Sequence, residues 1–312
     1  MANASESRKP DDLPALGKYR LEQPIGEGGM GIVYSALDTT LQRRVAIKML
    51  SQALAADTVA LNRFLREAQA AGRLNHRNVV SIYEVARRGT TYFIVMELVP
   101  GGNLAERLAA AGALPWREAT RIAADVCRGL VAAHAAGLVH RDVKPANFML
   151  DAEHHVKLAD FGLSKVVDQR GLTLTMANQT CGTPAYMSPE QCRFDEVNEL
   201  SDIYSLGASY FALLVGHAPF AGELPVQVMF AHCSSPCPDP CRLNANIPAA
   251  CGAIVQRAMA KSPADRYGSA AEMLAALERV HEERAEPPLA VQIRATPVPV
   301  VRGATRRTTA RS

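Results

Sequence analysis

One short segment of the chain gathers most of the side chains that could do chemistry. Residues 140–147 read HRDVKPAN, and the triplet Asp160-Phe161-Gly162 follows them. These stretches supply two carboxylates, a lysine and an amide, the groups needed to move the γ-phosphoryl group of Mg-ATP to a hydroxyl. That reaction asks a protein to orient the nucleophile, hold metal ions and neutralise charge. The expected roles are proton acceptor for Asp142, phosphate-side cation for Lys144, and Mg²⁺ ligand for Asn147 and Asp160.

An ordinary polar loop is the alternative interpretation, with His140 as a satisfied core histidine and Asp160-Phe161-Gly162 as a turn. The pattern H-R-D-x-K-x-x-N specifies five of the eight positions from 140 to 147. A D-F-G triplet follows within about one hairpin's length, as the signature set for protein phosphorylation requires. Two motifs at this spacing favour catalysis over coincidence.

A glycine-rich stretch upstream predicts a phosphate-binding loop. Its residues fit G-x-G-x-x-G-x-V: Gly26, Glu27, Gly28, Gly29, Met30, Gly31, Ile32 and Val33. A dinucleotide-binding turn would open a helix and needs an acidic residue about 20 positions later, and a P-loop needs a lysine where Ile32 stands. Here the flanking stretches 19–25 and 32–36 predict strands. The glycines therefore predict a hairpin whose backbone N–H groups can approach phosphate oxygens.

The next apolar strand, Val45-Ala46-Ile47-Lys48, ends in a lysine. A lysine that points inward needs an anion, which the phosphates of ATP would supply. A helix expected over 57–74 carries Glu67 beside its apolar stripe, and Glu67 would supply a second anion. The alternative for Glu67 is an ordinary helical ion pair with Arg63, four residues earlier.

Taken together, residues 19–281 resemble a Hanks-type Ser/Thr protein kinase, closest to the bacterial eukaryotic-like group. The resemblance implies that Lys48 binds the α- and β-phosphates and pairs with Glu67. It implies a hinge after the strand 92–96, with Met96 as gatekeeper and with backbone groups of Glu97 and Val99 offered to adenine. Val33 and Ala46 complete the nucleotide-binding set. The implied cofactors are ATP and Mg²⁺, with Mn²⁺ as a substitute.

The implied fold class is α+β, with two lobes. Residues 18–98 would form a small antiparallel sheet with one helix, and residues 99–283 a larger, mainly helical lobe. A helix is expected over 116–136, ending at Gly137. The final helix should begin with a capping box of Ser269 and Glu272 and run to about Glu283. Residues 1–17 and the Pro- and Arg-rich stretch 284–312 are expected to be disordered.

Other residues indicate the substrate class. Lys144 followed by Pro145 resembles the Ser/Thr form of the catalytic loop, and Gly182-Thr183-Pro184 resembles the Ser/Thr form of the peptide-docking segment. The resemblance implies that Thr183 bonds to Asp142 and Lys144. It implies two structural contacts as well: Glu190 with Arg266, and Asp202 with the catalytic-loop backbone. Ser188 stands where the family usually has alanine.

Control by phosphorylation is expected because Arg141 precedes Asp142, and a cation there can bind a phosphate on the activation segment. Thr175 lies eight residues before Thr183 and is the favoured site, with Thr173 and Thr180 in reserve. The resemblance leaves open a homodimer for autophosphorylation in trans.

Composition limits the remaining choices. The chain has 312 residues, 48% of them hydrophobic, which suffices for a sizeable core, and its net charge of +3 is too small to indicate nucleic acid. It contains no run of about 18 apolar residues and no signal-peptide pattern near Met1. Protein substrates and a cytoplasmic location are therefore expected.

The cysteines form an unusual series, because Cys233, Cys237 and Cys241 are spaced every four residues among seven in total. Zinc sites usually use C-x₂-C pairs. Reduced structural or surface thiols are expected, with metal binding and redox sensing as alternatives, and the odd total favours a reducing compartment.

Two rival functions remain open. One is phosphorylation of a small molecule by a protein of the same fold. Residues 182–190 and Arg266 favour peptide substrates instead. The other is a nucleotide-binding scaffold that signals by conformation.

Overall fold

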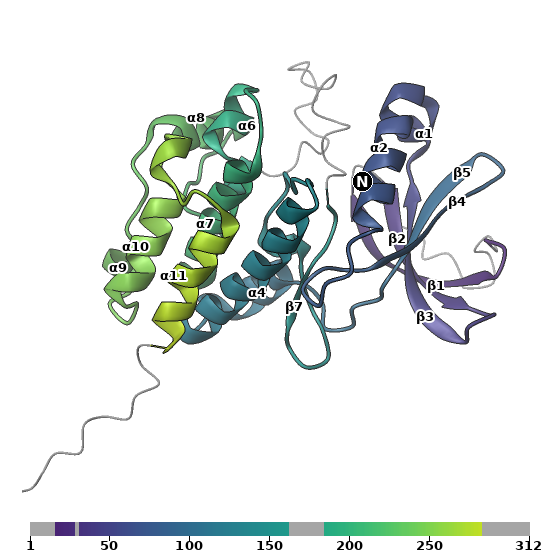
Figure 1. Cartoon of the computed structure of the whole chain (residues 1–312), viewed down its shortest axis with the longest axis horizontal. Helices are drawn as coiled ribbons and strands as arrows, with labels where there is room; N and C mark the ends of the chain where they lie inside the picture. Colours follow the sequence, from purple (N-terminus) through teal and green to yellow (C-terminus); the bar gives the residue numbers. More distant parts are fainter. Residues whose placement is uncertain (1–15, 29–30, 162–183, 283–312) are drawn as a thin grey trace, which may run out of the picture.

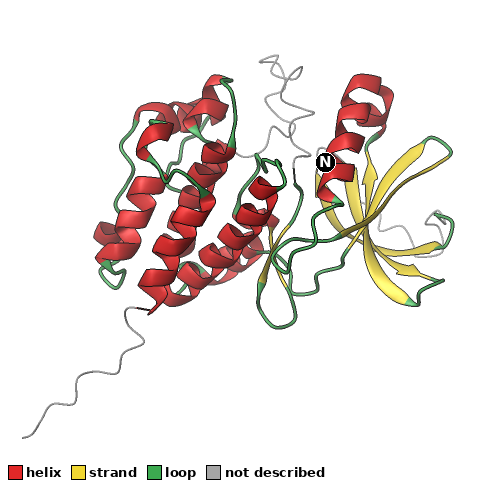
Figure 2. Cartoon of the chain, viewed as in Figure 1, coloured by secondary structure: helices red, strands yellow, loops and turns green. Residues whose placement is uncertain are grey.

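The computed structural model describes residues 16–28, 31–161 and 184–282, which form two lobes (Figure 1). One lobe is mainly sheet and the other mainly helix, and the chain crosses between them after β5 (Figure 2). This α+β architecture is the one that the sequence predicts.

The small lobe contains a five-stranded antiparallel sheet with strand order β1-β2-β3-β5-β4. Its strands are β1 (Tyr19–Gly28), β2 (Gly31–Asp38), β3 (Arg43–Leu50), β4 (Ile82–Arg88) and β5 (Thr91–Met96). Two helices accompany the sheet, α1 (Gln52–Ala56) and α2 (Thr58–Ala71), where one was expected. The additional helix forms because the Ser51 side chain caps it by accepting a hydrogen bond from the N–H of Leu54.

Helix α2 is amphipathic and covers one face of the sheet. Asp57 caps its start by accepting hydrogen bonds from the N–H groups of Val59 and Ala60. Phe64 and Ala68 lie one turn apart and are fully buried against Leu50 and Ile94. The helix ends at Ala71, short of the expected Leu74.

Strand pairing places the nucleotide-side residues on one face of the sheet. Val33 pairs with Lys48, and Ala46 pairs with Met96. Since paired residues share a face and residues two apart along a strand do so as well, all four side chains lie on the same side. The opposite face has its own core, which includes Leu16, a residue that the sequence placed in the N-terminal arm.

The glycine-rich stretch forms the β1–β2 hairpin, as predicted. Gly31 has a φ of +142°, and a Cβ there would lie 1.8 Å from the carbonyl oxygen of Met49. A side chain at this position would therefore collide with the backbone of β3, so the sheet itself requires a glycine at 31. Gly29 and Met30 lie outside the described residues.

The large lobe is built around α7 (Glu199–Val215), whose residues are nearly all buried. Around it lie α3 (Leu104–Ala111), α4 (Trp116–Ala135), α6 (Pro189–Arg193), α8 (Pro225–Ser234), α9 (Pro240–Leu243), α10 (Ala249–Ala258) and α11 (Ala270–Glu282). The described part of this lobe also contains a two-stranded ribbon, β6 (Phe148–Leu150) with β7 (Val156–Leu158), and three short 3₁₀ turns, Pro145–Asn147, Pro184–Tyr186 and Pro263–Asp265.

Two helix ends in this lobe can be compared with expectation. Helix α4 ends at Ala135, and Gly137 follows with a φ of +73°. In α11 the Ser269 side chain accepts from the N–H of Glu272, but the Glu272 carboxylate accepts from Gly268 rather than from Ser269. The expected capping box is therefore only half formed.

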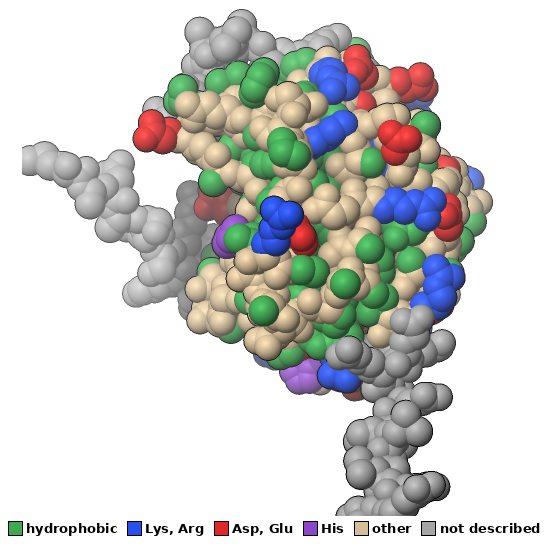
Figure 3. All heavy atoms as spheres, turned by 90° about the vertical axis from the view of Figure 1, so that its left-hand side faces the viewer, with side chains coloured by type: hydrophobic (Ala, Val, Ile, Leu, Met, Phe, Trp, Pro, Cys, Tyr) green, Lys and Arg blue, Asp and Glu red, His purple; other side chains and the backbone are tan. Residues whose placement is uncertain are grey.

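The end of the large lobe that α8, α9 and α10 form mixes apolar and charged side chains at the surface (Figure 3). Val226 and Phe230 of α8 and Leu243 of α9 are exposed there. Within the described ranges, no helix combines the length and the apolar character needed to cross a membrane.

Candidate active site

The two lobes are joined at the site by an ion pair between residues 112 positions apart. Lys48 Nζ lies 2.9 Å from Asp160 Oδ1. Lys48 is buried on the cleft-facing side of β3, so its charge needs this partner. Burial raises the pKa of Asp160, but the charge and hydrogen bond of Lys48, with smaller contributions from His140 and Lys144, together outweigh burial and lower that pKa below its ordinary value. The carboxylate is therefore held ionised.

The expected pairing of Lys48 with Glu67 is not what the described residues show. Glu67 Oε1 lies 3.6 Å from Arg141 Nη1, while Lys48 bonds to Asp160. The physical reason is proximity: Asp160 gives Lys48 a carboxylate at bonding distance, and the catalytic loop brings a second cation to Glu67.

Asp202 anchors the catalytic loop, as expected. Its fully buried carboxylate accepts hydrogen bonds from the backbone N–H groups of His140, at 2.8 Å, and Arg141, at 2.7 Å. The carboxylate has a third partner that was not expected from the sequence. His134 Nε2 lies 2.8 Å from it. Arg141 has a φ of +68°, a strained value for a side-chain-bearing residue, and these bonds hold it there.

The loop's functional groups lie close together. Lys144 Nζ is 2.9 Å from Asp142 Oδ2, and Asn147 Nδ2 is 3.1 Å from the same oxygen. Asn147 also donates to the backbone oxygen of Asp142 at 2.7 Å. Because these bonds use the amide nitrogen, they fix the side chain while its carbonyl oxygen stays a potential metal ligand. The His140 ring packs against the Phe161 ring, with centroids 4.6 Å apart and planes tilted by 57°, and this contact ties the loop to the residue after Asp160.

The hinge is held by side-chain contacts that the sequence did not reveal. The Glu97 carboxylate pairs with Lys157 of β7 at 3.0 Å and accepts from the N–H of Ser81 at 3.2 Å. Val99 is buried just after it. Glu97 thus connects the two lobes through its side chain, in addition to the backbone role expected of it.

The part of the large lobe around α6 is organised by the expected pair of Glu190 and Arg266. Both Arg266 terminal nitrogens bond to the carboxylate, at 2.7 and 2.9 Å, and the arginine side chain is fully buried. Burial raises the pKa of Glu190, but hydrogen bonds from Arg266 and Ser201 outweigh it and lower that pKa. The pair fixes α6 against α7 and the turn at 263–265.

Gln191 is a site residue that sequence reasoning missed. Its Nε2 donates to the backbone oxygen of Arg141 at 2.7 Å, next to Asp142. Its Oε1 accepts from the N–H of Ser188, whose hydroxyl caps the helix in return. The available signal was Ser188-Pro189-Glu190-Gln191, which fits the capping-box pattern with proline at the first helical position.

Several expected residues lie outside the described ranges: Thr173, Thr175, Thr180 and Thr183. Beside Lys48, a small cavity is lined by site residues including Met96, Asp160 and Phe161. A separate cavity of about 550 Å³, lined by Asn103, Glu106 and Arg107 among others, shares none of its residues with this one.

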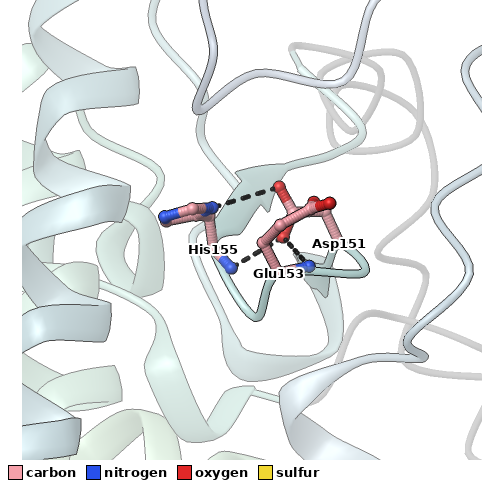
Figure 4. Close-up of side chains that lie close together, drawn as sticks. All are labelled: Asp151, Glu153 and His155. Carbon is pink, nitrogen blue, oxygen red and sulfur yellow. Dashed lines mark hydrogen bonds and ion pairs between the residues drawn. The ribbon is translucent and has the colours of Figure 1, made fainter.

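A second polar cluster is explained by its turn. Asp151, Glu153 and His155 gather between β6 and β7 (Figure 4). Asp151 Oδ1 accepts from the backbone N–H groups of Glu153, at 3.1 Å, and His155, at 2.7 Å. The carboxylate therefore closes the hairpin, and we assign it no catalytic part.

Comparison with known proteins defines the class. The protein kinase domain family matches residues 19–277, so the chain belongs to this family. The serine/threonine-protein kinase PknB of Mycolicibacterium smegmatis is 40% identical over 86% of this chain, and PknL of Mycobacterium tuberculosis is 40% identical over the same share. The predicted membership of the bacterial Hanks-type Ser/Thr protein kinases is therefore confirmed.

Solved structures agree with the fold. The kinase domain of Mycobacterium tuberculosis PknI superposes with a TM-score of 0.67 at 28% identity, covering 85% of this chain and 97% of that one. The chain spans 44% of the length of the M. smegmatis PknB relative and 67% of PknL.

Proposed function

We propose that this chain transfers the γ-phosphoryl group of Mg-ATP to Ser or Thr hydroxyls of proteins. The observation that carries the proposal is the meeting of Lys48 and Asp160 at 2.9 Å beside the Asp142–Asn147 cluster. Three segments distant in sequence thereby present a cation for phosphates, oxygen ligands for a metal and a carboxylate for a hydroxyl proton.

In the proposed reaction the substrate oxygen attacks the γ-phosphorus, the bond to the β-phosphate oxygen breaks, and ADP leaves. Asp142 orients the hydroxyl and accepts its proton, and Lys144 balances charge on the transferred group. Lys48 binds the α- and β-phosphates, and the backbone from Gly26 to Gly31 covers them. Glu67 is proposed to pair with Lys48 once Asp160 turns to the metal.

The donor set of the proposed metal site fits Mg²⁺. Asn147 and Asp160 offer an amide carbonyl oxygen and an ionised carboxylate, which are hard oxygen ligands. Mn²⁺ accepts the same ligand types and would substitute. The bound ion would neutralise charge on the β- and γ-phosphates.

Regulation and setting are part of the same proposal. Thr175 is the favoured autophosphorylation site, with Thr173 and Thr180 in reserve, and the half-buried Arg141 is the cation that would receive the phosphate. A homodimer would allow the reaction in trans. We place the catalytic unit at 18–283 and the activity in the cytoplasm, where ATP is available. Mass mapping of active protein with all three threonines unmodified would contradict the autophosphorylation proposal.

Labelled ATP separates this function from its rivals. Incubation with a generic basic protein should place the label on that protein's serines and threonines. Label found only on small hydroxyl compounds would indicate a small-molecule phosphotransferase. Binding of ATP without any transfer would indicate a nucleotide-binding scaffold.

A further inference from the structure

Two cysteines from different helices lie near each other where α6 meets α8. Cys192 belongs to α6 and is buried, and Cys233 lies near the end of α8 and is partly exposed. Cys233 Sγ donates to the backbone oxygen of Pro189 at 3.7 Å, and Arg193 Nη2 donates to the backbone oxygen of Cys233 at 3.4 Å. Because Pro189 and Arg193 are the two ends of α6, these bonds hold Cys233 beside the helix that carries Cys192.

Cys233 Sγ reaches the same short turn of α6 that carries Cys192, since its bonding partner, the backbone oxygen of Pro189, lies three residues before Cys192. Burial, followed by the neighbouring Cys233 thiol, raises the pKa of Cys192 to about 12, so Cys192 is a protonated thiol at neutral pH. Cys233 is the more exposed of the two, so it is the sulfur that an oxidant reaches first.

Helix α6 also connects this pair to the catalytic loop. Gln191, next to Cys192, bonds to the backbone oxygen of Arg141, and Glu190 bonds to Arg266. A shift of α6 would thus be transmitted to the backbone beside Asp142.

We propose that Cys192 and Cys233 are a site of reversible oxidation, at which a hydroperoxide converts the two thiols into a disulfide. The Cys233 thiolate attacks the peroxide and becomes a sulfenic acid, with water as the product when the peroxide is H₂O₂. The Cys192 sulfur then attacks the sulfenic sulfur, the S–S bond forms, and its proton and the departing hydroxide make a second water. The two thiols lose two electrons in total, which the peroxide gains.

The disulfide should slow phosphorylation. A disulfide requires a sulfur–sulfur distance of about 2.05 Å, so its formation cross-links α6 to α8. We expect this cross-link to displace the Gln191 bond to the catalytic loop. This consequence depends on the proposed kinase function, whereas formation of the disulfide does not.

The test treats the full chain with H₂O₂, blocks remaining thiols with iodoacetamide and maps peptides by mass spectrometry without reductant. The expected product is a peptide pair linking Cys192 and Cys233, lost after dithiothreitol. The linked pair should persist in the control variant Cys237→Ala. In the wild type the Cys237 thiol contacts Met259 Sδ at 3.5 Å and is not part of the proposed pair. In Cys192→Ala, dimedone should trap a sulfenic acid at Cys233. Absence of the linked pair at peroxide levels that oxidise Cys233, or a Cys233–Cys237 link, would overturn the proposal.

Transfer to a protein substrate is the second measurement. The wild-type chain and Cys237→Ala should lose about 10-fold or more of their rate on oxidation and regain it with dithiothreitol, since a shift of about 1 Å near a reacting group can cost about 10²-fold. Cys192→Ala should retain its rate. A disulfide that forms with no loss of rate would overturn the coupling to the catalytic loop.

Discussion

At the scale of single residues, the site depends on which carboxylate each cation meets. Lys48 bonds to Asp160, and Arg141 lies near Glu67. In the proposed reaction Lys48 faces phosphates and Asp160 faces the metal, so we expect the observed pairs to separate when nucleotide binds. Both ion pairs are formed between residues of the site, so Lys48 and Arg141 remain positioned to meet incoming phosphates.

Lys48→Met should therefore weaken both nucleotide binding and transfer. The variant removes the buried cation proposed to bind the α- and β-phosphates and leaves Asp160 without its partner. We expect ATP affinity to fall by about 10-fold or more, as for the loss of a charge-assisted contact worth about 1.5–3 kcal/mol. Titration calorimetry measures this, with Lys18→Met as the matched control, since Lys18 pairs with Asp38 elsewhere in the lobe. Unchanged affinity in Lys48→Met would contradict the assignment.

The catalytic-loop residues could be predicted because their motif fixes type and spacing together. The contact of Glu67 with Arg141 could not be predicted, because it depends on the position of α2 relative to the other lobe. No local sequence pattern encodes that position. Gln191 was predictable in principle as a capping residue, but its bond to Arg141 joins positions 50 apart.

At the scale of elements, buried polar contacts hold α6, α7 and α8 around the peptide-docking side. Arg266 bonds to Glu190 through two nitrogens and also to the backbone oxygens of Leu200 and Ala260. Arg266→Met should destabilise the fold by about 3–5 kcal/mol, because Glu190 is left as a buried unpaired charge.

Urea denaturation measures that cost. Arg266→Met combined with Glu190→Leu removes both charges and should recover part of the lost stability. If Arg266→Met alone were as stable as the wild type, the ion pair would contribute nothing to the free energy of unfolding.

His232 predicts a specific pH dependence. Burial lowers its pKa from 6.5 to about 4, and its Nδ1 lies 2.9 Å from the Tyr204 hydroxyl. As pH falls below 6.5 the unfolded chain takes up a proton that the folded chain refuses, so stability falls until about pH 4. Between pH 7 and pH 5 this histidine should account for a loss of about 2 kcal/mol.

Urea denaturation of the wild type and His232→Asn at both pH values isolates this effect. The wild type should lose about 2 kcal/mol more than the variant on going to pH 5. His217→Asn, which changes an exposed histidine, should behave like the wild type. Equal losses in the wild type and His232→Asn would refute the assignment.

Several elements were predicted from their glycines, periodicity and capping residues, including the β1–β2 hairpin and α4. Helix α1 was not, because its five residues carry too little pattern and its formation depends on the Ser51 cap. Leu74 was assigned to α2 because it is apolar at helical spacing, yet it is buried beyond the end of that helix.

At the scale of the whole molecule, function depends on two lobes meeting along one cleft. Lys48 and Val33 come from the sheet, while Asp142, Asn147 and Asp160 come from the other lobe. The overall architecture was predictable because the motifs fix its order along the chain. The relative position of the lobes was not, since it is set by contacts such as Glu97 with Lys157, which join the end of β5 to β7.

The most direct test compares the wild type with Asp142→Asn. Both are given labelled ATP, Mg²⁺ and a generic protein substrate, and ATP affinity is measured in parallel. Asparagine keeps the shape but cannot accept the hydroxyl proton, so transfer should fall by about 10²–10⁴-fold while ATP affinity is retained. Near-normal turnover in Asp142→Asn would contradict the assignment of Asp142 as the base, and with it the proposed phosphoryl transfer at this site.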